Sequence, residues 1–389
     1  MTTSAVASTT SLATIASRAQ LLALGECTHL DAALALRRNA LLPELVAHGF
    51  RSVALETDRV AALVVDDYVS GRRDDLEETL ERGFSHGFGR MEANRALVRR
   101  LRRHNEDADE SDRVSFHGID AAVENLSAPS PVWYLQQAAE YLGHTVDLAA
   151  VAGPEDRWSR TAAVTDAASS PGDGPAAREL RCWADDAANE LIARAPELLT
   201  ATSSAQWHRT RIILDAGLGL LRYHRQCART AEPAVRISGL LATRDALMAR
   251  NILDIRSLEA PRGPTLVFAH NSHLQRVPAT LVMSGMELGW TPAGAIVAQL
   301  SLEEQVFVAG SIGRSEGLGL GEPAAGSYEG MLDSWVDFWG IVEVSAMPAA
   351  ERRTDVSPQQ GYVPLDAHLL TDAAAVLHIR EGVADRSWI

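Results

Sequence analysis

A carboxylate and an imidazole lie three residues apart in this sequence, at the end of an apolar run. The run Leu21–Leu24 has the composition of a buried strand, and Glu26 and His29 follow it. A histidine of near-neutral pKa can remove a proton from water, and a neighbouring glutamate can orient the ring and stabilise the imidazolium. This pair therefore predicts acid–base chemistry at the point where a strand ends.

Three later segments have the same form, a β-like run that ends in an acid or a histidine. These runs end at Glu56, at His117 and Asp120, and at His270 and His273. In open α/β sheets, ligands bind beyond the carboxyl ends of the strands. We therefore expect the four strand ends to converge on one site.

The residue types suggest a role for each of these side chains. A glutamate can orient a histidine or act as a second acid, a histidine can act as base or polarise a carbonyl group, and an arginine can hold a developing oxyanion. The candidate catalytic residues are His29, Glu26, Glu56, His270 and His117. The candidate substrate-binding residues are Arg244, Arg38, His273, Asn271 and Asp120.

Composition limits the class of protein. The chain has 389 residues, of which 46% are hydrophobic and 22% charged, as expected of a globular protein with more than one folding unit. The net charge of -15 argues against nucleic acid and anionic membrane surfaces as partners. No apolar run approaches the roughly 18 residues of a spanning helix, and residues 1–19 lack the features of a secretory signal. We expect a cytoplasmic enzyme with a small-molecule substrate.

The basic and sulfur-containing residues exclude several chemistries. All 36 Lys and Arg residues are arginine, so there is no Schiff-base lysine, pyridoxal-phosphate anchor or phosphate-loop lysine. The cysteines Cys27, Cys182 and Cys227 are far apart, which argues against a thiolate zinc site or a disulfide framework. Cys27 lies inside the first motif, where a small packing residue is more common than a nucleophile. No Gly-x-Ser-x-Gly elbow is present, and we expect no cofactor.

The order of predicted elements indicates an α/β fold with a mostly parallel central sheet flanked by helices and an inserted helical subdomain. The predicted strands are 21–24, 52–55, 114–120, 265–269, 295–300, 305–309 and 374–379. Helices are predicted after the first strand, at 92–105, and at 133–148, 177–199, 206–229 and 237–255. We therefore expect a discontinuous α/β core of residues 1–125 and 255–389 and a helical insertion or cap of residues 126–254.

Several motifs in consistent order resemble the erythromycin esterase family. They are Gly25-Glu26-x-Thr28-His29, Arg38, His48-Gly49-Phe50 before a strand that ends at Glu56, His104-Asn105, Phe116–Asp120, Arg244-Asp245-x-x-Met248-Ala249-x-Asn251, Ala269–His273 and Gly326–Glu329. The resemblance implies an α/β core with a helical subdomain, and metal-independent hydrolysis of an ester or lactone. It also implies His29 as general base, Glu26 and Glu56 as residues that position it or the water, and His270, His117 and Arg244 along the cleft.

Some positions depart from the pattern of that family. The usual glycine after the first histidine is Leu30 here, and the usual charged residues that follow are Ala32 and Ala33. The tryptophan-rich segment expected near residues 85–91 is Ser85–Met91. These changes favour a tailoring enzyme acting on another bacterial natural product over an enzyme of macrolide resistance.

Three alternatives to metal-free hydrolysis remain open at this stage. The same base and charged pocket support a non-hydrolytic tailoring reaction, such as cyclisation, elimination or epoxide opening. Glu26, His29, Glu56 and His270 could instead ligate zinc or manganese in a metal-dependent hydrolase. The chain could also be a binding or self-resistance protein that sequesters a small molecule without turnover. The sequence does not indicate an oligomeric state.

Overall fold

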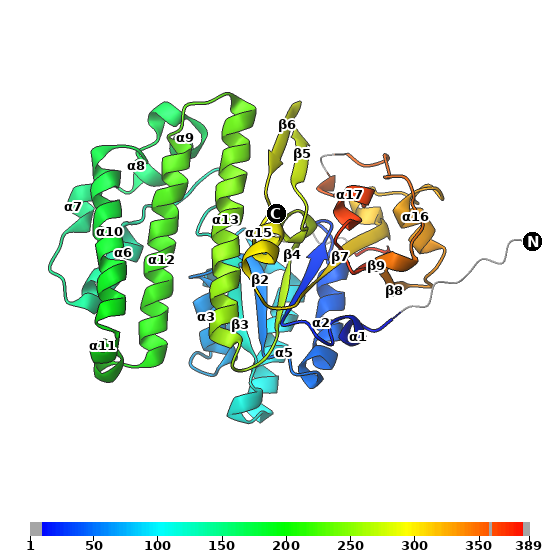
Figure 1. The fold of residues 1–389 in the computed structure, drawn as a ribbon, viewed down its shortest axis with the longest axis horizontal. Coiled ribbons are helices and arrows are strands. Elements are labelled where there is room, and N and C mark those ends of the chain that lie inside the picture. Colours follow the sequence, from blue (N-terminus) through cyan, green and yellow to red (C-terminus); the bar gives the residue numbers. More distant parts are fainter. Residues whose placement is uncertain (1–9, 358–359, 384–389) are drawn as a thin grey trace, which may run out of the picture.

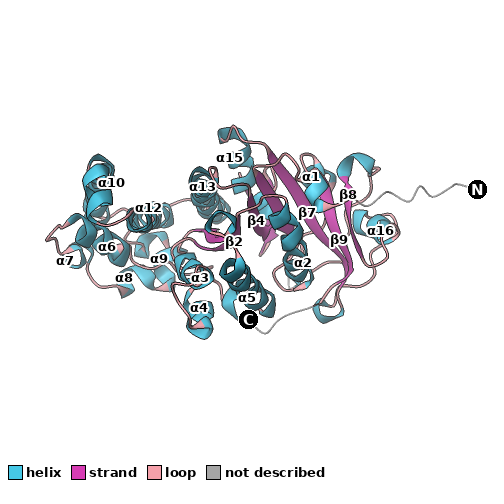
Figure 2. Cartoon of the chain, turned by 90° about the horizontal axis from the view of Figure 1, so that it is seen from below, coloured by secondary structure: helices cyan, strands magenta, loops and turns pink. Residues whose placement is uncertain are grey.

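A seven-stranded sheet of order β3-β2-β4-β1-β7-β9-β8 runs through the computed structural model, which describes residues 10–357 and 360–383 (Figure 1). All neighbouring strands pair in parallel except β8, which is antiparallel to β9. Helices cover both faces of the sheet (Figure 2). The predicted fold class, a mostly parallel α/β sheet flanked by helices, is confirmed.

The strands of the sheet are β1 (Leu21–Glu26), β2 (Ser52–Asp58), β3 (Ser115–Asp120), β4 (Thr265–His270), β7 (Gln305–Arg314), β8 (Trp339–Glu343) and β9 (Ala375–Glu381). A separate hairpin is formed by β5 (Ala279–Met283) and β6 (Met286–Trp290). The helices around the sheet are α1 (Leu12–Ile15), α2 (Ala33–Ala47), α3 (Ala62–Val69), α4 (Leu76–Arg82), α5 (Glu92–Asp107), α13 (Pro233–Glu259), α14 (Asn271–Leu274), α15 (Ala293–Leu300), α16 (Tyr328–Asp333) and α17 (Ala367–Leu370).

Alternating side chains of the strands form two apolar layers. Leu22 and Leu24 of β1 pack in the layer that holds α2 and α5, while Leu21 and Ala23 pack in the layer that holds α13 and α15. Successive side chains of a strand point to opposite faces, so a strand covered on both faces is apolar throughout. This explains why β1 reads in the sequence as one continuous apolar run.

One predicted strand is wrong, and two regions of strand were not predicted. Residues 295–300 lie in helix α15, where Ala293 and Val297, one helical turn apart, are buried. A short apolar run has the same composition in a buried helix as in a buried strand. The missed hairpin turns at Ser284 and Gly285, whose φ values of 50° and 78° are typical of a two-residue hairpin turn. Strand β8 was also missed.

Seven helices gather at one end of the molecule, on the left of Figure 1. They are α6 (Val132–Leu142), α7 (Leu148–Ala152), α8 (Asp156–Ser159), α9 (Thr161–Thr165), α10 (Pro175–Ala193), α11 (Ala195–Ala201) and α12 (Ser204–Cys227). Six of them share an apolar core that includes Leu135, Trp158 and Leu180, and Val164 of α9 packs in a separate apolar cluster. Helix α13 packs against α12 and also against β3, β6 and α15, so it crosses the expected boundary at residue 254. The division into core and insertion stays a prediction.

A side-chain clamp fixes the carboxyl end of β4 against β7. The Nδ2 atom of Asn271 donates a hydrogen bond to the Gly310 carbonyl at 2.8 Å, and the Gly310 amide donates to Asn271 Oδ1 at 3.0 Å. β1 lies between the two strands, and a Cβ at Gly25 would lie 2.0 Å from Asn271 Oδ1. Asn271 is fully buried and its amide is bonded to Gly310, so its predicted contact with substrate stays a prediction.

No helix in the described ranges is both long enough and apolar enough to cross a bilayer.

The substitution Gly25→Ala tests the clamp. The added methyl group must displace the Asn271 amide, so we expect a loss of unfolding free energy of roughly 1–3 kcal/mol, measured by urea denaturation. Gly321→Ala is the control, because a Cβ there meets no atom within 4 Å and its φ is not positive. Equal destabilisation by the two substitutions would contradict this account of Asn271.

Candidate active site

The carboxyl ends of three adjacent strands place acids and imidazoles side by side. β4 lies between β1 and β2, and Glu26 of β1 is in register with His270 of β4. From β1 the chain crosses to β2, towards the β3 edge of the sheet. From β4 it continues to β7, towards the opposite edge at β8. Ligands of open α/β sheets bind where the connections diverge in this way.

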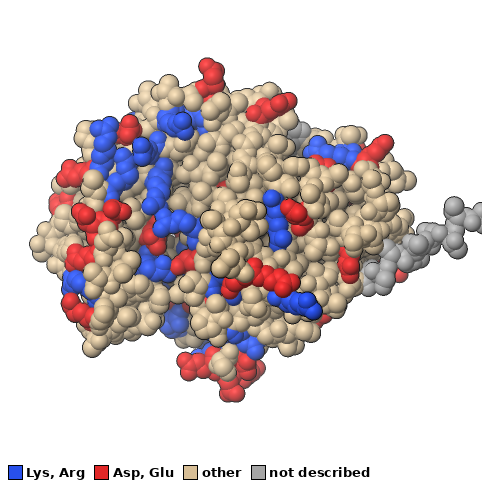
Figure 3. All heavy atoms as spheres, viewed as in Figure 1, with Lys and Arg blue, Asp and Glu red and all other residues tan. Residues whose placement is uncertain are grey.

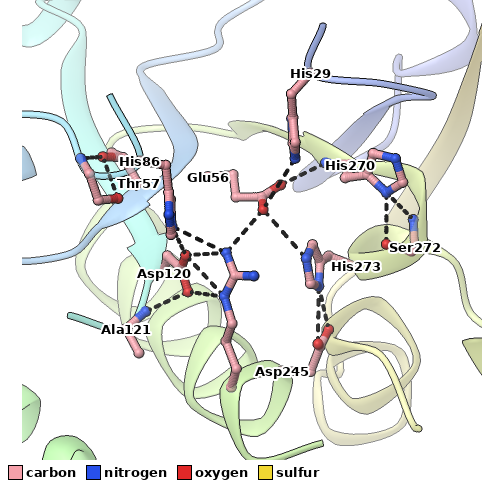
Figure 4. A network of polar contacts seen from close by, with 12 residues as sticks. His29, Glu56, Thr57, His86, Asp120, Ala121, Asp245, His270, Ser272 and His273 are labelled. Carbon is pink, nitrogen blue, oxygen red and sulfur yellow. Dashed lines mark hydrogen bonds and ion pairs between the residues drawn. The ribbon is translucent and has the colours of Figure 1, made fainter. Parts of the chain in front are cut away.

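The Glu56 carboxylate is the centre of the polar network drawn in Figure 4. Its Oε2 atom accepts a hydrogen bond from the backbone amide of His270 at 2.9 Å. Its Oε1 atom lies 3.2 Å from Arg244 Nη2, 3.4 Å from His273 Nε2 and 3.7 Å from His29 Nε2. Burial raises the pKa of Glu56, but His273, His29 and Arg244 outweigh it and lower the pKa well below its usual value. Glu56 is therefore ionised.

His29 is the most open histidine in contact with Glu56, with a side chain 27% exposed against 8% for His273. Its Nδ1–H donates to Glu26 Oε1 at 2.8 Å, which leaves the lone pair of the neutral ring on Nε2. The ring lies 5.1 Å from that of Phe88 between centroids. Burial lowers the pKa of His29, but the charge of Glu56 and the bond to Glu26 outweigh it, so the pKa is raised.

His270 is held neutral, in the tautomer opposite to that of His29. The backbone amide of Ser272 donates to His270 Nδ1 at 3.2 Å, so the proton of the neutral ring is on Nε2, which points to the Cys27 carbonyl at 3.3 Å. Burial, followed by the charge of His29, lowers the pKa of His270 to about 3. The ring centroids of His29 and His270 are 5.2 Å apart. The site thus pairs an imidazole that binds a proton readily with one that stays neutral.

His273 connects Glu56 to helix α13. Its Nδ1 atom lies 3.0 Å from both carboxylate oxygens of Asp245, and the Ala293 amide donates to Asp245 Oδ1 at 2.8 Å. Burial lowers the pKa of His273, but Asp245 and Glu56 outweigh it, so the pKa is raised. Two acids therefore hold this ring in place from opposite sides.

A second group of charges surrounds Asp120 at the end of β3. Arg244 donates to it through Nε at 2.9 Å and Nη2 at 2.5 Å, and His86 Nε2 lies 3.0 Å from Asp120 Oδ2. Glu124 contacts His86 Nδ1 at 2.8 Å. Burial raises the pKa of Asp120, but Arg244 and His86 outweigh it and lower the pKa to about 2. The bonds to Asp120 and Glu124 likewise overcome burial and raise the pKa of His86 to about 9.

The structure brings most of the candidates predicted from the sequence together. The residues found in this network are Glu26, His29, Glu56, Asp120, Arg244, His270 and His273. The network also contains residues that were not proposed for the site, namely His86, Glu124, Asp245 and Ser272. Asp245 is adjacent in sequence to the candidate Arg244, and this adjacency was a signal for it. The signal for His86 was its place in Ser85–Met91, the segment that departs from the pattern of the family.

His117 is not brought into the network. It lies three residues before the end of β3, roughly 10 Å back along the strand from Asp120. Its Nδ1 atom accepts from Arg59 at 3.0 Å, and its Nε2 atom contacts Glu259 at 2.7 Å. Both ring nitrogens are thus engaged in a separate ion-pair group, and the catalytic role expected of His117 stays a prediction that this position does not support.

Arg38 and Cys27 are buried near Glu26. Arg38 is buried in α2, where it donates to Asn39 and Asn94 and its guanidinium covers the Phe268 ring. Burial lowers the pKa of Arg38 to about 10, partly offset by Glu26. Arg38 makes no hydrogen bond to the other candidates in the described chain, so it acts as a buried charge near Glu26. Cys27 is fully buried, and burial and nearby carboxylates raise its pKa well above the usual value, which keeps the thiol protonated.

No three His, Cys, Asp or Glu side chains of residues 10–357 and 360–383 are grouped as a metal site.

Comparison with known proteins gives one family match and three solved structures of similar fold. The family model described as erythromycin esterase matches residues 45–386, so Glu26 and His29 precede the match. The structure is similar to a protein of Bacillus cereus (TM-score 0.66, 16% identity, 97% of this chain and 92% of that chain). It is also similar to a mutant of the erythromycin esterase EreC in its open conformation (TM-score 0.66, 19% identity, 96% of this chain and 93% of that chain). A succinoglycan biosynthesis protein is similar too (TM-score 0.67, 15% identity, 96% of this chain and 90% of that chain). At these identities the structures show the fold alone, and no curated protein matches the sequence.

The His86 ion pairs predict a specific dependence of stability on pH. Because the pKa of His86 is raised from 6.5 to about 9, its contribution is complete below pH 6.5 and is lost as the pH rises through 9. His86→Asn removes the charge at a residue with φ of 57°, which Asn tolerates. We expect it to lower the unfolding free energy at pH 6 by on the order of 2 kcal/mol, allowing for the half-exposed Glu124. Denaturation at pH 6 and pH 9.5 measures this; a difference between the two proteins that is independent of pH would contradict it.

Proposed function

Because the chain belongs to the erythromycin esterase family, and so to the ester hydrolases in general, we propose that it hydrolyses an ester or lactone bond of a bacterial natural product without a metal ion, using His29 as general base. The observation that carries this proposal is the position of His29. Its Nδ1–H is fixed by Glu26, its Nε2 faces Glu56 at 3.7 Å, and it is the most open histidine in contact with that carboxylate.

The proposed reaction follows from these contacts. The Nε2 atom of neutral His29 removes a proton from water, and the resulting hydroxide attacks the acyl carbon of the ester. The charge of Glu56 and the bond to Glu26 stabilise the imidazolium that forms. When the tetrahedral intermediate collapses, the acyl–oxygen bond breaks, the alkoxide takes the proton from His29, and an acid and an alcohol are released.

Other groups at the site can stabilise the oxyanion. His270 stays neutral and carries a proton on Nε2, whose contact with the Cys27 carbonyl is long at 3.3 Å, so this N–H can donate to a substrate oxygen. Arg244 adds positive charge beside Glu56, and so does the ring of His273 when it is protonated, which its raised pKa favours. Fixed charges in a site shielded from water stabilise a developing oxyanion without further rearrangement.

The contacts of Glu56 favour metal-free hydrolysis over the metal-dependent alternative. A metal bound by Glu56 and His29 would need a free carboxylate and neutral histidines. Glu56 already faces the guanidinium of Arg244 and the ring of His273, and the pKa values of His29 and His273, whose rings contact it, are raised. A divalent cation would be repelled by these groups.

The wall beside His29 supports a substrate other than a macrolide. Phe88 and His86 come from the segment Ser85–Met91, where the family resemblance predicts tryptophans, and the Phe88 ring packs against both His29 and His86. His86, paired with Asp120 and Glu124, makes this wall more polar than a tryptophan would. We therefore propose a natural product with a polar group near the scissile ester, and a tailoring role in secondary metabolism.

Turnover in heavy-oxygen water tests the reaction. With a panel of macrolides, simpler lactones, esters and epoxides, we expect one heavy oxygen in the product of the wild-type protein. In His29→Gln, loss of the base should lower kcat by roughly 10²–10⁴-fold. His144→Gln is the control, since His144 pairs with Glu190 in the helical region away from the site. A product of unchanged mass would mean cyclisation or isomerisation, and binding without turnover would mean sequestration; either result would overturn hydrolysis.

The pH profile tests the coupling between His29 and Glu56. His29 must be neutral to act as base, so kcat/KM should fall as the pH drops below its raised pKa. Glu56→Gln removes the charge that holds this pKa up, so the acidic limb should move to lower pH while the maximum rate also decreases. An unchanged limb in Glu56→Gln would show that the titrating base is a different group.

A further inference from the structure

An arginine-lined groove lies away from the active site, between the last turns of α12 and the outer side of α13. Two cavities of about 500 and 410 Å³ share four lining residues and so form one continuous groove. The groove is lined by four arginines and one acid, Asp173, together with two neutral polar side chains: Arg222, Arg225, Arg229, Arg250, Gln226 and Thr243. Figure 3 shows basic side chains gathered over the upper ends of α10 and α12, on a chain whose net charge is -15.

The geometry of the two helices forms the groove. Arg222 and Arg225 lie three residues apart on one face of α12, and Arg229 follows two residues after the helix ends at Cys227. Gly239 lets α13 approach closely, because a Cβ there would lie 2.1 Å from Gln226 Nε2. Arg250 comes from α13 on the opposite wall. A row of guanidinium groups therefore faces a second helix across a cavity.

Most of these arginines have no direct carboxylate partner. Within the described part of the chain, no ion pair is formed by Arg222, Arg225 or Arg229, and Arg250 has only Asp215 at 3.4 Å. The pKa of Arg222 is lowered first by burial and then by the charge of Arg250, and the more weakly acting acids Asp215 and Asp185 offset this only in part. The pKa of Arg181, on α10, is lowered first by burial and then by the charge of Arg225. Like charges are thus held together at both ends of the groove.

Capping of α12 accounts for only part of this arrangement. A basic residue in the last turn of a helix interacts favourably with the free carbonyl groups there, and Arg225 lies in that turn. Arg222 lies before the last turn, and Arg250 belongs to a different helix. An anion between the two helices would neutralise all of them and remove their mutual repulsion.

We propose that this groove binds a small polyanion with at least two phosphate groups, one held by Arg222 and Arg250 and the next by Arg225 and Arg229. The planar guanidinium matches phosphate oxygens two at a time, and it suits partly buried anion sites better than a hydrated ammonium. The cavity volumes are within the usual range for small-molecule sites. Thr243 supplies a hydroxyl group on the α13 wall, although it also donates to Gly239.

Isothermal titration calorimetry at 0.15 M salt tests this site with inorganic triphosphate, ATP and adenosine as probes. We expect one saturable site per chain for triphosphate and ATP, and none for adenosine. Equal affinities would mean that the phosphate chain alone is recognised, and tighter binding of ATP would mean that the base adds a contact. Saturable binding of adenosine, or no binding of either anion, would overturn the proposal.

A matched pair of variants separates the groove from general attraction of anions. Arg222→Ser/Arg225→Ser/Arg229→Ser should weaken triphosphate binding by at least tenfold. Arg99→Ser/Arg100→Ser/Arg103→Ser removes the same charge from α5, beside a cavity of about 380 Å³ that also contains Glu92, and should leave binding unchanged. The single change Arg250→Ser, at a side chain 52% exposed, should also weaken triphosphate binding, and urea denaturation of this variant checks that it is folded. Equal loss in both triple variants, or preference for a DNA duplex over triphosphate, would overturn the proposal.

Discussion

The buried charge of Glu56 is the constraint on which the site depends. A carboxylate that is 4% exposed costs several kcal/mol unless it is paired and hydrogen-bonded. Its partners come from separate parts of the chain: the His270 amide at the end of β4, His273 in α14, Arg244 in α13 and His29 after β1. Because no single element can satisfy this carboxylate, its burial requires the sheet, α13 and the β1 loop to assemble together.

The same carboxylate and its neighbours separate the histidines by protonation state. His29 and His273 each face two acids, and their pKa values are raised. His270 is buried, faces no acid of the described chain through its ring, contacts Ser272 at Nδ1 and lies beside the charge of His29, so its pKa falls to about 3. Three residues of the same type thus acquire different proton affinities from their surroundings alone.

Helix α13 links the polar network to the rest of the fold. Its inner side carries Arg244 and Asp245 to the network, while Met248 and Ile252 pack in the apolar layer on the sheet. Its outer side forms one wall of the arginine-lined groove, through Thr243 and Arg250. Adjacent residues of one helix thus serve two different surfaces, which explains the mixed polar and apolar sequence of this segment.

The strands and the first motif could be predicted from the sequence for simple physical reasons. A strand covered on both faces must be apolar throughout, so β1, β2 and β4 stand out as continuous runs, and an acid or histidine directly after such a run must lie at a sheet edge. Glu26 and His29 are only three residues apart, so their contact is local. The 295–300 segment failed this reasoning because buried helices and buried strands share one composition.

The contacts between distant residues were decided only by the tertiary structure. The sequence shows that His117, Arg38 and Asn271 are polar, but it does not show their neighbours. His117 pairs with Glu259, Arg38 packs on Phe268, and Asn271 is hydrogen-bonded to Gly310. His86 and Asp245 entered the network for the same reason. Strand order and register, which depend on contacts between segments far apart in the chain, determine which buried charges meet. The sequence by itself therefore determined the kinds of chemistry available, and the tertiary structure determined which residues can take part in it.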